Sequence, residues 1–255
     1  MTRRLLWLLA FCLLLALPAH AEESLSLPQC QTVEQVVALL RYPADGAQPV
    51  DAERGFIRYI SQDTTKEPDF CMAYWLGGEP GGDLDLTLEV GRFKKPYDYY
   101  ARNMCTRAVY SMALSYLGID MTPGGMSAML EKRDISAPYD EVTDLLPELE
   151  QVTFSTYVFQ SMFEAYQSDA GYSPVYLYIR RPDNSTHALL VVARHENGRY
   201  IVIDPKYHEV KGEPVHVYTI ALDKTCRKIV NSDFRAEQAG SKILQYHQWR
   251  LIETE

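Results

Sequence analysis

Residues 103–120, NMCTRAVYSMALSYLGID, place one cysteine at the start of a predicted helix. The apolar residues behind Cys105 recur at the i, i+3, i+4 and i+7 spacing of a buried helical face: Val109, Met112, Ala113 and Tyr116. Gly118 follows them and matches the glycine that commonly ends a helix. The pattern predicts a helix that begins at Cys105 and packs one face into the core.

This position makes the Cys105 thiol a candidate nucleophile. The first N–H groups of a helix have no partner inside the helix, and the positive end of the helix dipole favours the thiolate. Arg102 and Arg107 add positive charge on either side. A thiol placed in this way is expected to be reactive.

The N-terminus has the three parts of an export signal. Residues 1–21 contain basic Arg3 and Arg4, an apolar run over 5–17, and a small-residue pattern that ends at Ala21. The apolar run is too short for a comfortable membrane span. We therefore expect a soluble periplasmic or secreted protein with no integral membrane segment after signal removal.

Composition excludes some partners. The chain has 255 residues, 47% of them hydrophobic, which is enough for one large domain or two small ones. Removal of residues 1–21 leaves 23 basic and 34 acidic residues, a formal charge of −11, so no basic face is available to bind nucleic acid.

Four cysteines remain after that removal. An even number in an oxidising compartment allows three disulfide pairings of Cys30, Cys71, Cys105 and Cys226. Our guess for a bridge is Cys30 with Cys71, since both precede the candidate nucleophile. A purely structural role for Cys105 is the alternative to a reactive thiol.

Residues 22–95 predict a small α+β region whose function the sequence does not show. Thr32 and Gln35 fit a capping box before a short helix that ends near Pro43. Residues 56–60, 70–76 and 84–90 have the composition or alternation of strands.

A group of helices is expected after the Cys105 helix. Thr122 and Pro123 favour a helix start with an end near Lys132, residues 140–149 are helical in composition, and residues 155–169 are amphipathic with Gly171 as the stop.

From Pro174 the apolar period changes from 3.6 to 2. Strands are predicted at 175–179, 188–193, 199–203, 214–222 and 243–251, and they should form an antiparallel sheet. His187 opens the second strand and Asp204 closes the third, with a hairpin turn at Asn197 and Gly198 between them. Both residues lie toward the end remote from the turn, so their side chains are expected to approach at the sheet rim.

Cysteine, histidine and a carboxylate are the parts needed for thiol-based acyl transfer. The histidine takes the thiol proton, the thiolate attacks a carbonyl, the imidazolium protonates the leaving amine, and the acid orients the ring. For each of these residues taken singly a structural role is the alternative: a strand-end histidine for His187 and a turn residue for Asp204.

Two segments resemble one family. MCTRAVYSMALSYLGIDMTP (104–123) and STHALLVVARHENGRYIVIDP (185–205) are similar to the cysteine and histidine segments of bacterial papain-like peptidases related to the double-glycine leader peptidases of bacteriocin exporters. The resemblance covers about residues 96–207 and implies a papain-like α+β domain over 96–255. It also implies Cys105 as nucleophile, His187 as general base and acid, and Asp204 as the orienting acid.

The chain departs from that family at the cysteine. Thr106 and Arg107 follow Cys105 where the family commonly has a small pair, and no glutamine lies between Val90 and Met104 to stabilise the oxyanion. Asn103 is the substitute donor, together with the Cys105 backbone N–H, although Asn103 equally suits a helix N-cap. No transporter segments are present, so a role in bacteriocin export is not expected.

Other signatures are missing from the sequence. It has no GxSxG, HExxH, CxxC or phosphate-binding glycine loop, and the remaining histidines have no ligand spacing. We expect neither a cofactor nor a metal.

Two hypotheses remain. The first is an exported thiol hydrolase that cleaves an amide bond of a peptide, a protein or a cell-wall peptide, with a transferase of the same mechanism not separable from it. The second is a catalytically silent papain-like domain that binds peptide or protein in the same cleft, one form of which has Cys105 in a disulfide with Cys226 or another partner. A free Cys105 with a lowered pKa favours the enzyme.

Overall fold

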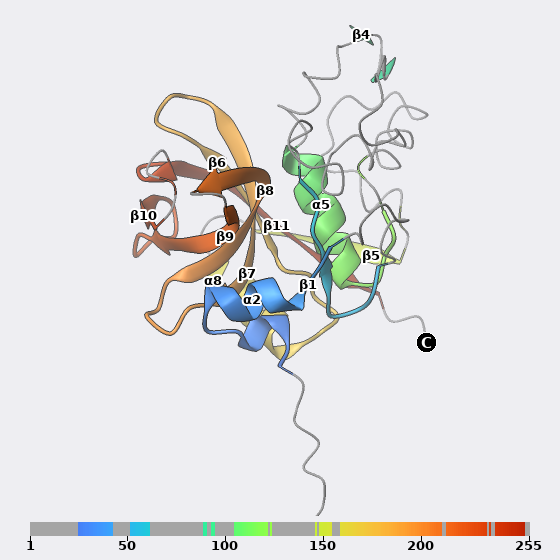
Figure 1. Cartoon of the computed structure of the whole chain (residues 1–255). Coiled ribbons are helices and arrows are strands. Elements are labelled where there is room, and N and C mark those ends of the chain that lie inside the picture. Colours follow the sequence, from blue (N-terminus) through green and yellow to red (C-terminus); the bar gives the residue numbers. More distant parts are fainter. Residues whose placement is uncertain are drawn as a thin grey trace, which may run out of the picture.

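The computed structural model describes most of the C-terminal half of the chain and parts of the N-terminal half. The described residues are 25–42, 52–61, 89–90, 93–94, 105–121, 123, 146, 148–154, 159–210, 213–233, 235 and 238–252. They form an α+β structure with a mostly antiparallel sheet, which is the predicted class (Figure 1).

One sheet dominates the described part of the chain. Its strands, in the order in which they are hydrogen-bonded, are β10 (Ile229–Ser232), β9 (Glu213–Leu222), β8 (Tyr200–Val210), β7 (Thr186–Arg194), β6 (Val175–Arg180), β11 (Lys242–Leu251) and β5 (Leu149–Phe154). Every neighbouring pair is antiparallel. The predicted strands from residue 175 onward are thus confirmed, and β5 and β10 are additional.

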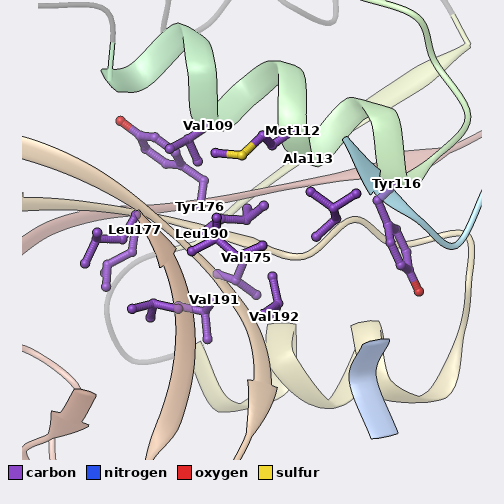
Figure 2. Packing of buried hydrophobic residues seen from close by; sticks show 14 of the residues in the cluster. Val109, Met112, Ala113, Tyr116, Val175, Tyr176, Leu177, Leu190, Val191 and Val192 are labelled. Carbon is purple, nitrogen blue, oxygen red and sulfur yellow. The ribbon is translucent and has the colours of Figure 1, made fainter. Parts of the chain in front are cut away.

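The predicted nucleophile helix is α5 (Cys105–Tyr116). Gly118 ends it with a φ of +80°, a left-handed conformation that glycine adopts without the steric cost of a Cβ. Figure 2 shows Val109, Met112, Ala113 and Tyr116 pointing from α5 toward the sheet, as the spacing predicts.

The expectation of a single buried face on α5 is wrong, however. All of its residues except Arg107 are buried, including Thr106, Ser111 and Ser115. A second layer therefore covers the outer side of the helix, and the N-terminal region contributes to it.

That layer contains β2 (Ile57–Arg58), which pairs in parallel with β1 (Leu40–Arg41). The Arg58 backbone N–H donates to Ser115 Oγ at 3.0 Å. The buried Arg58 guanidinium reaches Asp120 Oδ1 at 2.5 Å beyond the end of α5, and the Gly55 N–H donates to the Tyr116 carbonyl at 2.8 Å. The described part of the N-terminal region thus shares one core with α5 and the sheet.

The other face of the sheet is covered as well. The helix α8 (Phe159–Ser168) and the 3₁₀ turn η1 (Leu27–Gln29) pack on β6 and β7, and α2 (Val33–Leu39) packs on β9. Residues 187–193 of β7 are therefore all buried, which accounts for their nearly continuous apolar sequence.

A bulge interrupts β8 beside Asp204. Ile203 pairs with Val217, but the next pair of β8 and β9 is His208 with Val215. Between these two pairs the chain advances by five residues in β8 and by only two in β9. Pro205 lies in this bulge, where its lack of an N–H costs no ladder bond. The prediction that Asp204 closes the strand is therefore wrong, because β8 continues beyond the bulge to Val210.

Three other boundaries differ from the prediction. The capping box of Thr32 and Gln35 is confirmed, but α2 ends at Leu39, before the predicted end near Pro43, because β1 begins at Leu40. The strand predicted at 56–60 is only Ile57–Arg58. Leu149 begins β5 and does not end a helix, because it pairs with Leu251 of β11.

Several predictions fall outside the described residues. These are the export signal at 1–21, the strand at 70–76, most of the strand at 84–90 (residues 89–90 form β3, Glu89–Val90, paired with β4, Phe93–Lys94), nearly all of the helix from 122 to 132, and residues 140–145 and 155–158.

Arg58→Ala is expected to destabilise the fold by about 2 kcal/mol, because it removes buried hydrogen bonds that join β2 to the end of α5. Urea unfolding measures this free energy. The matched control is Arg180→Ala on an exposed position of β6, expected to change stability by less than about 0.5 kcal/mol. Equal effects of the two substitutions would contradict the joining role of Arg58.

Candidate functional site

Cys105 lies at the first position of α5 with only 7% of its surface exposed. The backbone N–H groups of Thr106 and Ala188 hydrogen-bond to its sulfur, as does the side chain of His187. Ala188 belongs to β7, so the thiol lies where the start of the helix meets the sheet.

His187 is the second residue of β7 and is buried. It pairs with Ile179 of β6 on one side. On the other side, the pairing of β7 with β8 begins only at Leu190, which faces Ile203, so His187 has no strand-pairing partner in β8. β8 has left the ladder at this point because the bulge begins at Asp204.

The structure brings His187 and Asp204 together. His187 Nε2 lies 2.7 Å from Asp204 Oδ1, so the proximity predicted for the two side chains at the sheet rim is confirmed. Because Nε2 is engaged by the carboxylate, Nδ1 is the ring nitrogen left for the Cys105 thiol. His187 thus contacts both Cys105 and Asp204, and all three residues are buried.

The pKa values of the three groups shift together. Burial raises the pKa of the Cys105 thiol, but the hydrogen bond and charge of His187 outweigh burial and lower it. Burial likewise lowers the pKa of His187, and the Asp204 carboxylate outweighs it and raises the pKa. Both shifts favour a thiolate paired with an imidazolium.

Asp204 remains ionised although it is completely buried. Burial raises its pKa, but His187, the charge of Arg235 and the Lys206 N–H together bring the pKa far below its ordinary value. The Lys206 N–H donates to Oδ1 at 2.8 Å, while Tyr218 and Gln238 side chains donate to Oδ2 at 2.8 and 3.3 Å. Arg235 Nε lies 3.5 Å from the same oxygen.

No motif in the sequence marks Tyr218, Arg235 and Gln238 as residues of the site. They follow Asp204 by 14 to 34 residues. Only the general rule that a buried carboxylate needs donors indicates that such residues exist, and it does not say which ones.

The N-terminal region supports the backbone of the same residue. Tyr59, directly after β2, donates its hydroxyl to the Asp204 carbonyl at 3.2 Å. The His216 ring lies 4.2 Å from the Tyr59 ring, and His216 Nε2 lies 2.7 Å from the Tyr42 hydroxyl. Burial lowers the pKa of His216 to about 4, so this histidine is neutral at neutral pH.

Cys30, Cys105 and Cys226 are free thiols. The guessed bridge of Cys30 with Cys71 is therefore wrong for Cys30, which is buried beside η1 and hydrogen-bonded to the Ser26 carbonyl. Burial raises the pKa of Cys30 to about 11 and also raises the pKa of Cys226.

Asn103, the predicted second oxyanion donor, lies outside the described residues. Of the two donors that we expected, the Cys105 backbone N–H belongs to the described part of the chain. It is one of the first N–H groups of a helix, which have no intrahelical acceptor.

An open cavity of about 630 Å³ lies elsewhere, lined by residues 28–31, Gln167, 194–196 and Gly198. It is at the opposite end of β7 from His187 and includes neither His187 nor Cys105 nor Asp204. Within the described residues, no group of three His, Cys, Asp or Glu side chains could hold a metal ion. No helix in that part of the chain is long and apolar enough to span a membrane.

Comparison with protein-family models and with curated proteins finds no match to this chain.

Asp204→Asn tests the electrostatics of the site. Loss of the carboxylate charge removes what raises the pKa of His187, so that pKa falls, the imidazolium is lost, and the pKa of Cys105 rises. The rate of Cys105 alkylation by iodoacetamide, followed against pH, should shift to higher pH.

Asp233→Asn is the control, because it removes a carboxylate that pairs with Arg199 on the same sheet, away from Cys105. A Cys105 profile that is the same in Asp204→Asn as in the unmodified protein would show that Asp204 does not control the pair.

Proposed function

We propose that the protein is a thiol-dependent hydrolase with a papain-like fold, and that it cleaves an amide bond of a peptide, a protein or a cell-wall peptide. The observation that carries the proposal is the buried contact series from Cys105 through His187 to Asp204, at the junction of a helix N-terminus and an antiparallel sheet. The order of the three residues along the chain also matches the family that the two sequence segments resemble.

The acylation step follows from the ion pair. The Cys105 thiolate attacks the carbonyl carbon, a C–S bond forms, and the carbonyl oxygen takes the negative charge. The Cys105 backbone N–H, with Asn103 as the proposed second donor, stabilises this oxyanion. The tetrahedral intermediate then expels the amine, whose nitrogen receives the proton from His187 Nδ1, and a thioester remains.

Deacylation reverses the role of the histidine. Neutral His187 takes a proton from water, the hydroxide oxygen attacks the thioester carbonyl, and the C–S bond breaks. The carboxylic acid leaves, and the thiolate and imidazolium are restored. Asp204 keeps Nε2 hydrogen-bonded throughout, so the imidazolium is stabilised whenever it forms.

The form of the binding-module alternative in which Cys105 is in a disulfide with Cys226 is not supported. Among the described residues, Cys105, Cys226 and Cys30 are free thiols. A lowered Cys105 pKa also serves no evident purpose in a silent domain, while a nucleophile needs it.

The first test is iodoacetamide labelling of the unreduced protein from pH 5 to 9, with peptide mapping of each cysteine. Cys105 should alkylate with a midpoint well below the ordinary thiol value of about 8.5. Cys30 and Cys226 are internal controls, because burial raises their pKa values and they should react only at the alkaline end. A Cys105 that is found in a disulfide, or that titrates like an ordinary thiol, would refute the proposal.

The second test is turnover of a peptide library followed by mass spectrometry. Cys105→Ala should lower the cleavage rate by on the order of 10³-fold or more with an unchanged circular dichroism spectrum, while Cys226→Ala should keep the activity. The pH profile should be bell-shaped, rising as the Cys105 thiolate forms and falling as His187 loses its proton. Full cleavage by Cys105→Ala would assign the activity to another group.

A further inference from the structure

The two oxygens of Asp204 have separate partners. Oδ1 lies 2.7 Å from His187 Nε2 and accepts the Lys206 N–H at 2.8 Å. Oδ2 accepts from the Tyr218 hydroxyl and from Gln238 Nε2, at 2.8 and 3.3 Å. The oxygen that faces the imidazole is thus different from the one that the two downstream side chains hold.

Tyr218 and Gln238 also contact each other. The Tyr218 hydroxyl lies 2.8 Å from Gln238 Oε1 as well as from Asp204 Oδ2, so its single proton serves one or the other acceptor. The Gln238 amide donates to the carboxylate through its nitrogen. The three side chains form a closed set of polar contacts, which we call the Oδ2 clamp.

The Oδ2 clamp is built from two separate elements and is shielded from water. Tyr218 belongs to β9, and Gln238 lies in the turn between β10 and β11, where its N–H donates to the Arg235 carbonyl at 2.9 Å. Gln238 is fully buried and Tyr218 nearly so. Burial raises the pKa of Tyr218 well above its ordinary value, and the Asp204 charge adds to the effect, so the hydroxyl keeps the proton that it donates.

A carboxylate needs such a clamp to act as an orienting group. Rotation about the last bond of an aspartate is soft, and a hydrogen bond to one oxygen alone leaves the other free to exchange with it. Rotation of Asp204 would break the contact of Oδ1 with Nε2 and let the imidazole turn away from the sulfur. Partners fixed on Oδ2 prevent this rotation.

We propose that Tyr218 and Gln238 are positioning residues of the site: by holding Asp204 Oδ2 they keep Oδ1 on His187 and thereby keep Nδ1 facing Cys105. This inference rests on the proposed function, since it names two further residues of the same site. Neither residue touches the thiol, so both act through Asp204.

The charged and titratable groups that face Asp204 are His187, Arg235, His216 and Tyr218. Removal of the Tyr218 hydroxyl or the Gln238 amide changes none of the three charged or basic side chains. A change in the titration of Cys105 in such a variant therefore reports on the orientation of Asp204 and His187.

The experiment compares Tyr218→Phe, Gln238→Met and the double variant with the unmodified protein. Iodoacetamide labelling gives the pH profile of Cys105, and thermal unfolding gives the stability. The control is Tyr246→Phe, which removes the hydroxyl of another buried tyrosine. That hydroxyl donates to the Cys226 carbonyl at 2.6 Å and is not a hydrogen-bond partner of Asp204.

In the double variant the Cys105 profile should move to higher pH by about one unit, which lowers the alkylation rate near pH 6 on the order of tenfold. Each single variant should show a smaller shift in the same direction. Tyr246→Phe should lower the melting temperature and leave the Cys105 profile in place. Gln238→Met keeps the volume of the side chain and is the decisive variant if Tyr218→Phe does not fold.

Clamp variants that lose stability like Tyr246→Phe but keep the Cys105 profile would overturn the positioning role. This outcome differs from failure of the proposed function, in which the unmodified protein itself shows an ordinary Cys105 profile.

Discussion

The buried charge of Asp204 is the constraint on which the rest of the site depends. A carboxylate without exposure to water is stable only if its neighbours supply charge and hydrogen bonds. Here they come from β7, from β9, from the backbone of the bulge and from the segment after β10, so four separate parts of the fold have to meet at one group. In return, Asp204 stabilises the imidazolium form of His187 next to the thiol.

The bulge in β8 makes this meeting possible. In a regular ladder Asp204 would point along a fixed alternation between the faces of the sheet, with its backbone paired to β9. The unpaired stretch between Ile203 and His208 frees the backbone around Pro205, so that the Lys206 N–H turns back to the Asp204 side chain. A bulge that re-aims one side chain beside a reactive group is a common use of this irregularity.

The described part of the N-terminal region packs in the same core as the helix and the sheet that carry the site. Arg58 is joined to the end of α5, and the next residue, Tyr59, donates to the carbonyl of Asp204. Two consecutive residues therefore connect the helix that carries the thiol with the strand that carries the acid. Because α5 is covered by β2 near its C-terminal end and by the sheet along β6, β7 and β8, the helix is packed between two layers.

The sequence by itself determined the local elements: the α5 helix that begins at Cys105, the Gly118 stop, the hairpin at Gly198, and the α+β class, because each follows from periodicity or from backbone conformation over a few residues. It also indicated that His187 and Asp204 lie near each other, because one hairpin joins them. The burial of α5 on all sides, the bulge at Pro205 and the Tyr218 and Gln238 contacts were decided by tertiary structure alone. They depend on segments far apart in the chain, and no local pattern encodes which of them will meet.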